Sequence, residues 1–271
     1  MGKVNESSKV KLKEKIDNML YWSYNLLSNL FFIFSANRKR VKRNHCLKNK
    51  HLGERCFILG TGPSLKNTNI DLIKKEIIFG VNFLYKSDLI NLIKPQYYCL
   101  YDEIFHTSHQ SNTIELINKL QETNFILRTK AARFVEENSL NSDRIFFQHC
   151  NQYQYGEHIK LDMTMSMTAP FNVILGCLQS AIYMGFNEIF LLGCDYNSFA
   201  SLKVEHCYDN GKSPERVMSI GFELKYYSMV SFHHYAIEKY AREHGVKIVN
   251  LTPNSLLDAY ERSSLEQILN I

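Results

Sequence analysis

A glycine-rich turn follows the first apolar run of the sequence. Residues 60–64 read Gly-Thr-Gly-Pro-Ser and come directly after residues 55–59 (RCFIL), which have the composition of a buried strand. Glycine lets a backbone approach a ligand closely, and the amide N–H groups of such a turn can hold phosphate or ribose oxygens. The turn has neither the third glycine of the dinucleotide fingerprint nor the GK[ST] ending of a P-loop. It predicts a nucleotide or phosphate site at the carboxyl edge of a sheet, and a plain tight turn is the alternative.

Polar side chains also follow three other apolar runs. Asn82 ends FGVN, Asp102 ends CLYD, and Asp195, Tyr196 and Asn197 follow LLGC. Ligands of open α/β sheets lie outside the carboxyl ends of the strands. Each of these residues could cap an ordinary loop, but together they indicate one shared crevice.

Short apolar runs alternate with helical patterns from residue 55 onward. Strands are predicted at 55–59, 76–81, 96–101, 124–129, 144–148, 188–192 and 246–250. Helices are predicted between them at about 69–75, 109–122, 131–138, 171–184 and 228–244. This alternation predicts an α/β fold with a doubly wound, mostly parallel Rossmann-like sheet and helices on both faces. Residues 198–227 lack clear periodicity and are expected to form a long loop or lid.

A possible capping residue precedes the helix predicted at 171–184. Thr168 is a suitable N-cap, and Pro170 stands just inside the helix. The hydroxyl of Thr168 and the nearby amides would then face the crevice, and a plain cap is the alternative.

The first 50 residues differ in charge from the rest. Residues 1–55 carry nine more basic than acidic residues, whereas 56–271 carry four more acidic than basic ones. This distribution argues against a nucleic-acid groove on the main body and for an anionic surface that meets the arm. The apolar segment 20–36 is short for a bilayer span and contains polar residues. We therefore predict a basic amphipathic helical arm, 1–50, on a membrane surface and a globular domain, 51–271; packing of the arm on the domain or on a partner subunit is the alternative.

The seven cysteines are odd in number, lie mostly in apolar runs and include no CxxC pair. They predict reduced, buried thiols in a cytoplasmic protein rather than a disulfide framework or a zinc cluster. The protein would be peripheral on the inner face of the cytoplasmic membrane if the arm binds lipid. The chain could also form a homo-oligomer, which the sequence does not decide.

In three places the sequence resembles the bacterial lipooligosaccharide sialyltransferases. The turn GTGPSL resembles their G-N-G-P-S-L, residues 185–195 (GFNEIFLLGCD) fit G-[YF]-x-E-I-[YF]-L-x-G-x-D, and residues 253–257 read PNSLL. The resemblance covers roughly residues 55–260. It extends to the broader group that contains hydroxymethylpterin diphosphokinase-like proteins and motility accessory factor glycosyltransferases. The sequence departs from the pattern at Thr61 and Asp102, where asparagines are expected.

The resemblance implies a glycosyltransferase that moves sialic acid, a related nonulosonate or Kdo from a CMP-sugar donor. The acceptor would be a glycan or a lipid-linked glycan of the cell surface, in lipopolysaccharide or capsule biosynthesis. Mapped onto this sequence, the family's donor contacts are Gly60, Thr61, Gly62, Pro63, Ser64, Asn82 and Thr168. The strand-end residues Asp102, Asp195, Tyr196 and Asn197 complete the predicted donor site.

The resemblance also implies a histidine base in the loop after the G-x-D strand. His206 lies in that loop, and an imidazole with a pKa of about 6.5 suits removal of a hydroxyl proton at neutral pH. A solvent-facing loop histidine is the alternative. His233 and His234 fall within the helix predicted at 228–244 and are expected on a helix face.

The departing phosphate needs hydrogen-bond donors rather than a metal clamp. No D-x-D motif occurs, so the usual Mg²⁺ or Mn²⁺ site of enzymes that use nucleoside diphosphate-sugars is not predicted, and no cofactor is expected. The single phosphate of CMP can be stabilised by hydroxyls and amides. Tyr208, or Tyr226 and Tyr227, could donate such a hydrogen bond, and the sequence does not choose among them.

Two other classes of function stay open. A diphosphokinase would need clustered carboxylates for Mg²⁺–ATP, which Asp102, Glu103 and Asp195 could supply if they meet. A non-enzymatic scaffold of polysaccharide assembly, anchored through residues 1–50, would bind no nucleotide.

Overall fold

The computed structural model describes residues 8–154, 156–201, 203–209 and 218–270. The lid predicted at 198–227 falls partly on residues 202 and 210–217, which lie outside this range.

The described residues form one nine-stranded sheet in which all neighbouring strands are parallel. The strands lie in the order β6-β5-β4-β3-β2-β1-β7-β8-β9. The predicted doubly wound α/β fold is therefore confirmed. In chain order the strands are β1 (Arg55–Leu59), β2 (Ile77–Val81), β3 (Tyr97–Leu100), β4 (Asn124–Arg128), β5 (Ile145–Gln152), β6 (Ser166–Thr168), β7 (Glu188–Leu192), β8 (Lys247–Asn250) and β9 (Glu261–Arg262).

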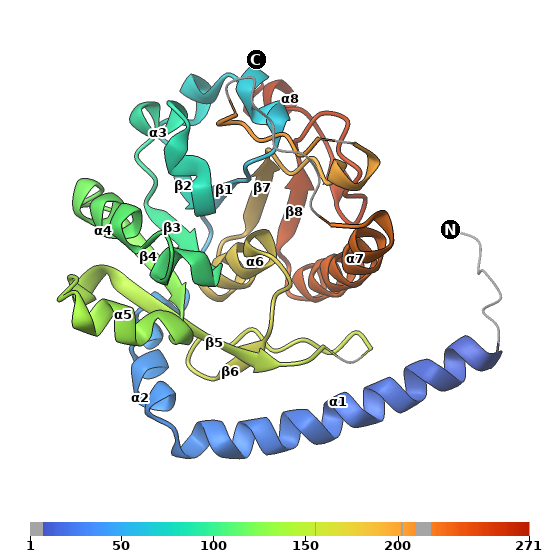
Figure 1. Ribbon diagram of the computed structural model, residues 1–271. Coiled ribbons are helices and arrows are strands. Elements are labelled where there is room, and N and C mark those ends of the chain that lie inside the picture. Colours follow the sequence, from blue (N-terminus) through green and yellow to red (C-terminus); the bar gives the residue numbers. More distant parts are fainter. Residues whose placement is uncertain (1–7, 155, 202, 210–217, 271) are drawn as a thin grey trace.

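Alternate side chains of the strands enter two hydrophobic cores, one on each face of the sheet. Helices cover both faces (Figure 1). On β1, Cys56 and Ile58 share a core with α6 (Val173–Tyr183) and α7 (Ile220–Glu243). Phe57 and Leu59 enter the opposite core. Because each strand is buried on both faces, its sequence is an unbroken apolar run. The opposite core is covered by α3 (Leu89–Leu92), α4 (Gln110–Lys119), α5 (Ala132–Glu137) and α8 (Leu265–Leu269).

The direction of winding reverses beside β1. Strands β2 to β6 are added one after another on one side of β1, and α6 then leads to β7, which pairs with β1 on its other side. The sheet therefore has its switch point between β1 and β7. Such a point creates the crevice in which ligands of open α/β sheets bind.

Several elements differ from the sequence prediction. The N-cap of α6 is Asn172, whose side chain accepts a hydrogen bond from Leu175 N (2.9 Å). The predicted capping role of Thr168 is wrong, because Thr168 ends strand β6 and its N–H donates to Lys160 O (3.0 Å). Helix α7 begins at Ile220 rather than at 228, a 3-10 helix occupies part of the helix predicted at 69–75, and the short strands β6 and β9 are absent from the prediction.

The N-terminal arm contains one long helix and shorter helical segments. α1 (Ser8–Phe34) runs without a break through the charged and the apolar segments, and α2 (Ala36–Lys42) follows. In Figure 1, α1 extends along one edge of the molecule. Val41 and Leu47 are buried in the globular part. No helix among the described residues is long and apolar enough to cross a membrane.

Two adjacent histidines of α7 are fully buried. His233 and His234 both have an exposed fraction of 0%. Neither ring nitrogen of His233 has a hydrogen-bond partner among the described residues. Burial lowers the pKa of His233 to about 4. The folded chain therefore keeps a neutral imidazole at pH values where the unfolded chain binds a proton.

We predict that the free energy of unfolding falls as the pH decreases from about 6.5 toward about 4. The unfolded state binds more protons in this window, and His233 alone accounts for roughly 3 kcal/mol across it. His233→Phe removes the buried ring nitrogens and should lose less stability over the same window. Urea unfolding, followed by circular dichroism at several pH values, measures the difference. If the free energy of unfolding depends on pH equally in the wild type and in His233→Phe, this explanation is contradicted.

Candidate active site

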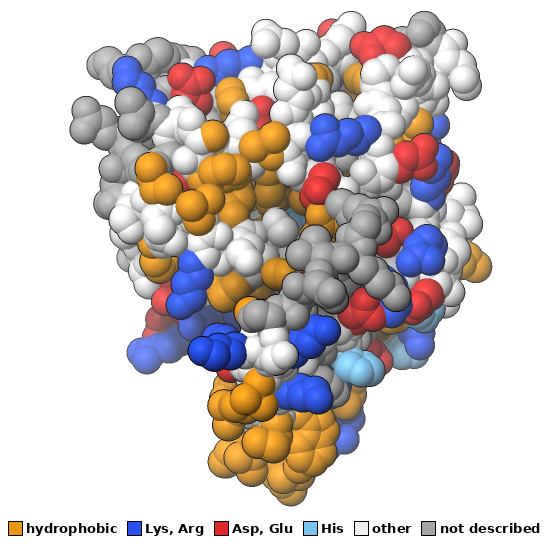
Figure 2. Space-filling model, turned by 90° about the vertical axis from the view of Figure 1, so that its right-hand side faces the viewer, with side chains coloured by type: hydrophobic (Ala, Val, Ile, Leu, Met, Phe, Trp, Pro, Cys, Tyr) orange, Lys and Arg blue, Asp and Glu red, His pale blue; other side chains and the backbone are white. Residues whose placement is uncertain are grey.

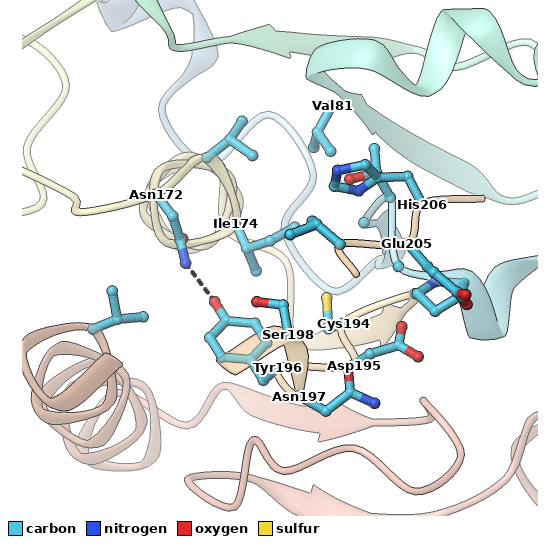
Figure 3. A pocket seen from close by; sticks show the side chains of 18 of the residues that line it. Val81, Asn172, Ile174, Cys194, Asp195, Tyr196, Asn197, Ser198, Glu205 and His206 are labelled. Atoms are coloured by element: carbon cyan, nitrogen blue, oxygen red, sulfur yellow. Dashed lines mark hydrogen bonds between the residues drawn. The ribbon is translucent and has the colours of Figure 1, made fainter. Parts of the chain in front are cut away.

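A cavity of about 230 Å³ lies at the switch point of the sheet. The glycine turn after β1 and the loop after β7 form two of its walls, and the start of α6, residues 204–206 and α7 complete it. Figure 3 shows His206 on one side of the cavity and Asn172 with Tyr196 on the other. The predicted site residues that line the cavity are Gly60, Thr61, Gly62, Pro63, Asp195, Tyr196, Asn197 and His206.

The glycines of the turn allow it to pack closely against the loop after β7. Gly60 N donates to Leu192 O (2.8 Å), and Gly62 N donates to Gly193 O (2.9 Å). A β-carbon on Gly60 would lie 2.3 Å from Gly193 O, so a side chain cannot be accommodated without moving the backbone. Both N–H groups already have acceptors within the protein. The expectation that these two amides hold a phosphate is therefore corrected: the glycines bring the two loops together.

Asp195 fixes the turn to the loop after β7. Its Oδ2 accepts a hydrogen bond from Ser64 Oγ (2.8 Å), and its Oδ1 accepts one from Ser64 N (3.2 Å). A β-carbon on Gly62 would lie 1.8 Å from Asp195 Oδ2. Burial raises the pKa of Asp195, and the two hydrogen bonds from Ser64 oppose this shift. Both side chains are thus engaged with each other and position the turn.

Asn82 and Asp102 form a pair beside the cavity. Asn82 Nδ2 donates to Asp102 Oδ2 (2.9 Å), and Asn82 Oδ1 accepts from Tyr101 N (3.3 Å). The backbone of Asn82 has a φ of 41°, a left-handed conformation that asparagine tolerates better than most residues. Val81 lines the cavity, whereas Asn82 and Asp102 do not. The structure therefore places this pair at the ends of β2 and β3, outside the cavity wall.

Thr168 does not reach the cavity. Its side chain is buried, Oγ1 accepts a hydrogen bond from Lys160 N (2.8 Å), and its carbonyl accepts one from Gln179 Nε2 (2.9 Å). Asn172 lines the cavity in the position expected for Thr168. The sequence TAPFN offers two good capping residues, and the pairing of β6 with β5 decides between them.

A chain of side-chain hydrogen bonds runs from Asn172, at the cavity, into the core of the protein. The sequence did not predict these contacts. Asn172 Nδ2 donates to Tyr196 OH (2.5 Å; Figure 3), Tyr196 OH lies 2.6 Å from His234 Nε2, and His234 Nδ1 lies 2.7 Å from Tyr260 OH. Burial lowers the pKa of His234, so its imidazole is neutral. Tyr196 has a left-handed backbone, with φ 55°, which typically costs about 1–3 kcal/mol. The network holds Tyr196 in this conformation and thereby directs the loop after β7.

His206 lies on the opposite side of the cavity. Its ring stacks on that of Tyr208, with 4.9 Å between the ring centroids, and its backbone N–H donates to Asp209 Oδ2 (2.8 Å). Burial lowers the pKa of His206, while the carboxylate of Asp209 and the backbone of Thr61 oppose the shift. The imidazole is therefore neutral at neutral pH and can accept a proton. Tyr208 is not a cavity-lining residue.

Tyr226 and Tyr227 reach the cavity from α7. Tyr226 OH donates to Phe171 O (2.6 Å), and the hydroxyls of Tyr227 and Ser198 are hydrogen-bonded to each other. Burial raises the pKa of Tyr226 to about 12, so its hydroxyl stays protonated and can act as a donor. Of the three tyrosines considered as donors to the phosphate, Tyr226 and Tyr227 line the cavity and Tyr208 does not.

A family model described as 6-hydroxymethylpterin diphosphokinase MptE-like matches residues 24–199, which is more than half of the chain. The chain belongs to this family. The predicted likeness to the broader group is confirmed. The matched range includes the glycine turn and Asp195 of the MptE-like chain and ends before His206. No curated protein matches the sequence.

Solved sialyltransferase structures resemble the MptE-like chain. The structure of CST-II in complex with trisaccharide acceptor and CMP has a TM-score of 0.50 and 17% sequence identity, over 78% of this chain and 86% of that chain. This likeness supports a shared fold. CstII from Campylobacter jejuni in complex with cytidine-5'-monophosphate has a TM-score of 0.48 and 14% identity, over 79% and 86% of the two chains. An alpha-2,3-sialyltransferase from Campylobacter jejuni in apo form has a TM-score of 0.44 and 17% identity, over 80% and 84%.

We predict that Gly60→Ala destabilises the protein by about 1–3 kcal/mol or more, because the new β-carbon overlaps Gly193 O. Gly221→Ala is the matched control. A β-carbon at Gly221, in the first turn of α7, would meet nothing within 4 Å. That substitution should be neutral or stabilise by up to about 1 kcal/mol. Urea unfolding midpoints measure both effects, and equal stabilities of the two variants would show that the close approach of the loops is not required.

Proposed function

We propose that this protein is a glycosyltransferase that moves an acidic sugar from a CMP-sugar to a glycan or lipid-linked glycan acceptor. The sugar would be sialic acid, a related nonulosonate or Kdo. The observation that carries the proposal is the single cavity that joins the glycine turn, His206 and two tyrosine hydroxyls at the switch point of the sheet. A structure named for CMP and a trisaccharide acceptor shares this fold, which supports the class of donor.

In the proposed reaction His206 is the general base. Its neutral imidazole takes the proton of the acceptor hydroxyl while the hydroxyl oxygen bonds to the anomeric carbon of the sugar. The bond between that carbon and the phosphate oxygen breaks, and CMP leaves with the electron pair. Because burial keeps the pKa of His206 below its usual value, the base form is available at neutral pH.

The departing phosphate would be stabilised by neutral donors. The hydroxyls of Tyr226 and Tyr227 at the cavity can donate to phosphate oxygens once they exchange their present protein partners for the ligand. Thr61 and Asn197, which also line the cavity, add a hydroxyl and an amide. We assign Tyr208 to a positioning role, because it stacks beneath the His206 ring.

A diphosphokinase that uses Mg²⁺–ATP is the second candidate, and the description of the matching family favours it. Such an enzyme needs carboxylates that converge on the metal. Among the described residues, no three His, Cys, Asp or Glu side chains gather where they could hold a metal ion. The carboxylates suggested for that role have separate partners: Asp102 with Asn82, Asp195 with Ser64, and Glu103 with Lys130.

We predict that CMP binds more tightly than UDP or GDP and that EDTA does not abolish binding. The reason is the hydrogen-bond donors at the small cavity of the switch point and the lack of a D-x-D motif. Isothermal titration calorimetry with CMP, UDP, GDP and ATP, with and without Mg²⁺, measures this. A preference for ATP with obligatory Mg²⁺ would support the kinase instead, and no binding of any nucleotide would support a scaffold.

We predict that His206→Ala keeps the wild-type affinity for CMP but lowers turnover by about 10²–10⁴-fold, the usual contribution of a positioned base. Release of CMP from a panel of CMP-sugars measures turnover. His45→Ala, which removes an exposed histidine outside the cavity, is the control and should leave turnover unchanged.

The pH dependence of turnover also tests His206 as the base, because turnover falls at acid pH as the imidazole binds a proton. The carboxylate of Asp209 raises the pKa of His206, so Asp209→Asn should move the acid limb to lower pH without changing the plateau. Normal turnover in His206→Ala, or an acid limb that does not move in Asp209→Asn, would contradict the role of His206 as base.

A further inference from the structure

α1 contacts the globular part along one face, which includes polar side chains. Asn25 pairs with both backbone groups of Tyr153: Nδ2 donates to the carbonyl and Oδ1 accepts from the N–H, each at 2.7 Å. Ser28 Oγ donates to Asn151 O (3.0 Å). Asn25 and Ser28 are three residues apart and share one helix face. These polar residues hold α1 against the end of β5 together with Phe32, which is buried and stacks on the ring of His149.

Many apolar side chains of α1 are exposed to solvent. Phe31 is 78% exposed and Phe34 is 88% exposed. Their exposure places these side chains on the side of α1 that the globular part leaves uncovered. Figure 2 shows hydrophobic side chains gathered at the lower end of the molecule, where α1 lies, with Lys and Arg side chains above them. We call this the outer face of α1; it comprises Leu12, Met19, Leu20, Leu27, Phe31 and Phe34.

Basic residues flank the outer face at both ends. Lys9, Lys11 and Lys15 are exposed near the start of α1, and Lys39 and Lys42 are exposed in α2. The first 55 residues carry an excess of nine basic residues, while the rest of the chain is mildly acidic. A helix with an apolar face and flanking lysines has the composition of a segment that lies in the interface of an anionic bilayer.

We propose that the outer face of α1 is a docking surface for an anionic lipid bilayer, with the helix axis parallel to the membrane plane. The polar face is held by the backbone near β5, so the outer face is the one available to lipid. Trp22, which is 54% exposed beside this face, would sit at the headgroup level.

The distribution of charge favours lipid over a second copy of the chain. Two copies joined through their outer faces would bring together two arms that each carry a large positive excess. An anionic membrane neutralises that excess while it covers the apolar side chains. The inference does not depend on the identity of the nucleotide or on the proposed transfer reaction.

The test is co-sedimentation of the full chain with vesicles. Wild-type protein should sediment with vesicles of phosphatidylcholine and phosphatidylserine, and much less with vesicles of phosphatidylcholine alone. Leu27→Gln/Phe31→Gln should weaken binding by at least tenfold, because it removes two apolar side chains from the interface. Lys39→Gln/Lys42→Gln should weaken it by about fivefold for each lysine and should reduce its dependence on salt.

The matched control is Leu52→Gln/Leu92→Gln, which replaces two exposed leucines outside α1 in the same way. This variant should bind vesicles as the wild type does. Thermal melts of both double variants should match that of the wild type, because all four side chains are exposed, and this excludes misfolding as the cause of lost binding. CMP affinity is measured in parallel as a separate readout, so a failure of the proposed function is distinguishable from a failure of this inference.

Three results would overturn the proposal. The first is wild-type protein that does not prefer anionic vesicles. The second is Leu27→Gln/Phe31→Gln that sediments as well as the wild type. The third is a wild-type dimer in analytical ultracentrifugation that this double variant dissociates, without any binding to vesicles; the outer face would then be an interface between copies of the chain.

Discussion

The close approach of two loops at the switch point is the constraint on which the rest of the site depends. The turn after β1 lies against the loop after β7 with no room for a β-carbon at Gly60 or Gly62. Two backbone hydrogen bonds and the carboxylate of Asp195 hold the loops in this position. The two glycines therefore allow one loop to pack against the other. The cavity forms beside this contact rather than within it.

The loop that carries His206 is hydrogen-bonded to the glycine turn after β1. Cys207 N donates a hydrogen bond to Thr61 O (2.8 Å), so the imidazole and the glycine turn share one wall of the cavity. On the other side, Asn172 joins the start of α6 to Tyr196 and through it to the buried His234. Hydrogen bonds thus tie both walls to the sheet, and the cavity between them is lined by hydroxyls, an amide and an imidazole, with the carboxylates of Asp195 and Glu205.

Much of the fold could be predicted from the sequence, because a parallel strand buried on both faces is an unbroken apolar run. The site was harder to predict, since the fate of a polar group depends on partners distant in the sequence. The amide of Gly60 meets a carbonyl of β7, and Thr168 pairs with Lys160 rather than capping a helix. In α1, Asn25 and Ser28 interrupt an apolar segment, yet both form hydrogen bonds with the domain. Pattern alone does not show which face of that helix the protein covers.

The most direct measurement is a crystal structure of the full chain with CMP. We predict CMP in the cavity between Thr61, Asn197 and His206, with its phosphate near the hydroxyls of Tyr226 and Tyr227. We also predict that Gly60 N and Gly62 N stay hydrogen-bonded to Leu192 O and Gly193 O in the complex, and this is the central expectation. CMP bound elsewhere, or a phosphate held by those two glycine amides, would contradict it.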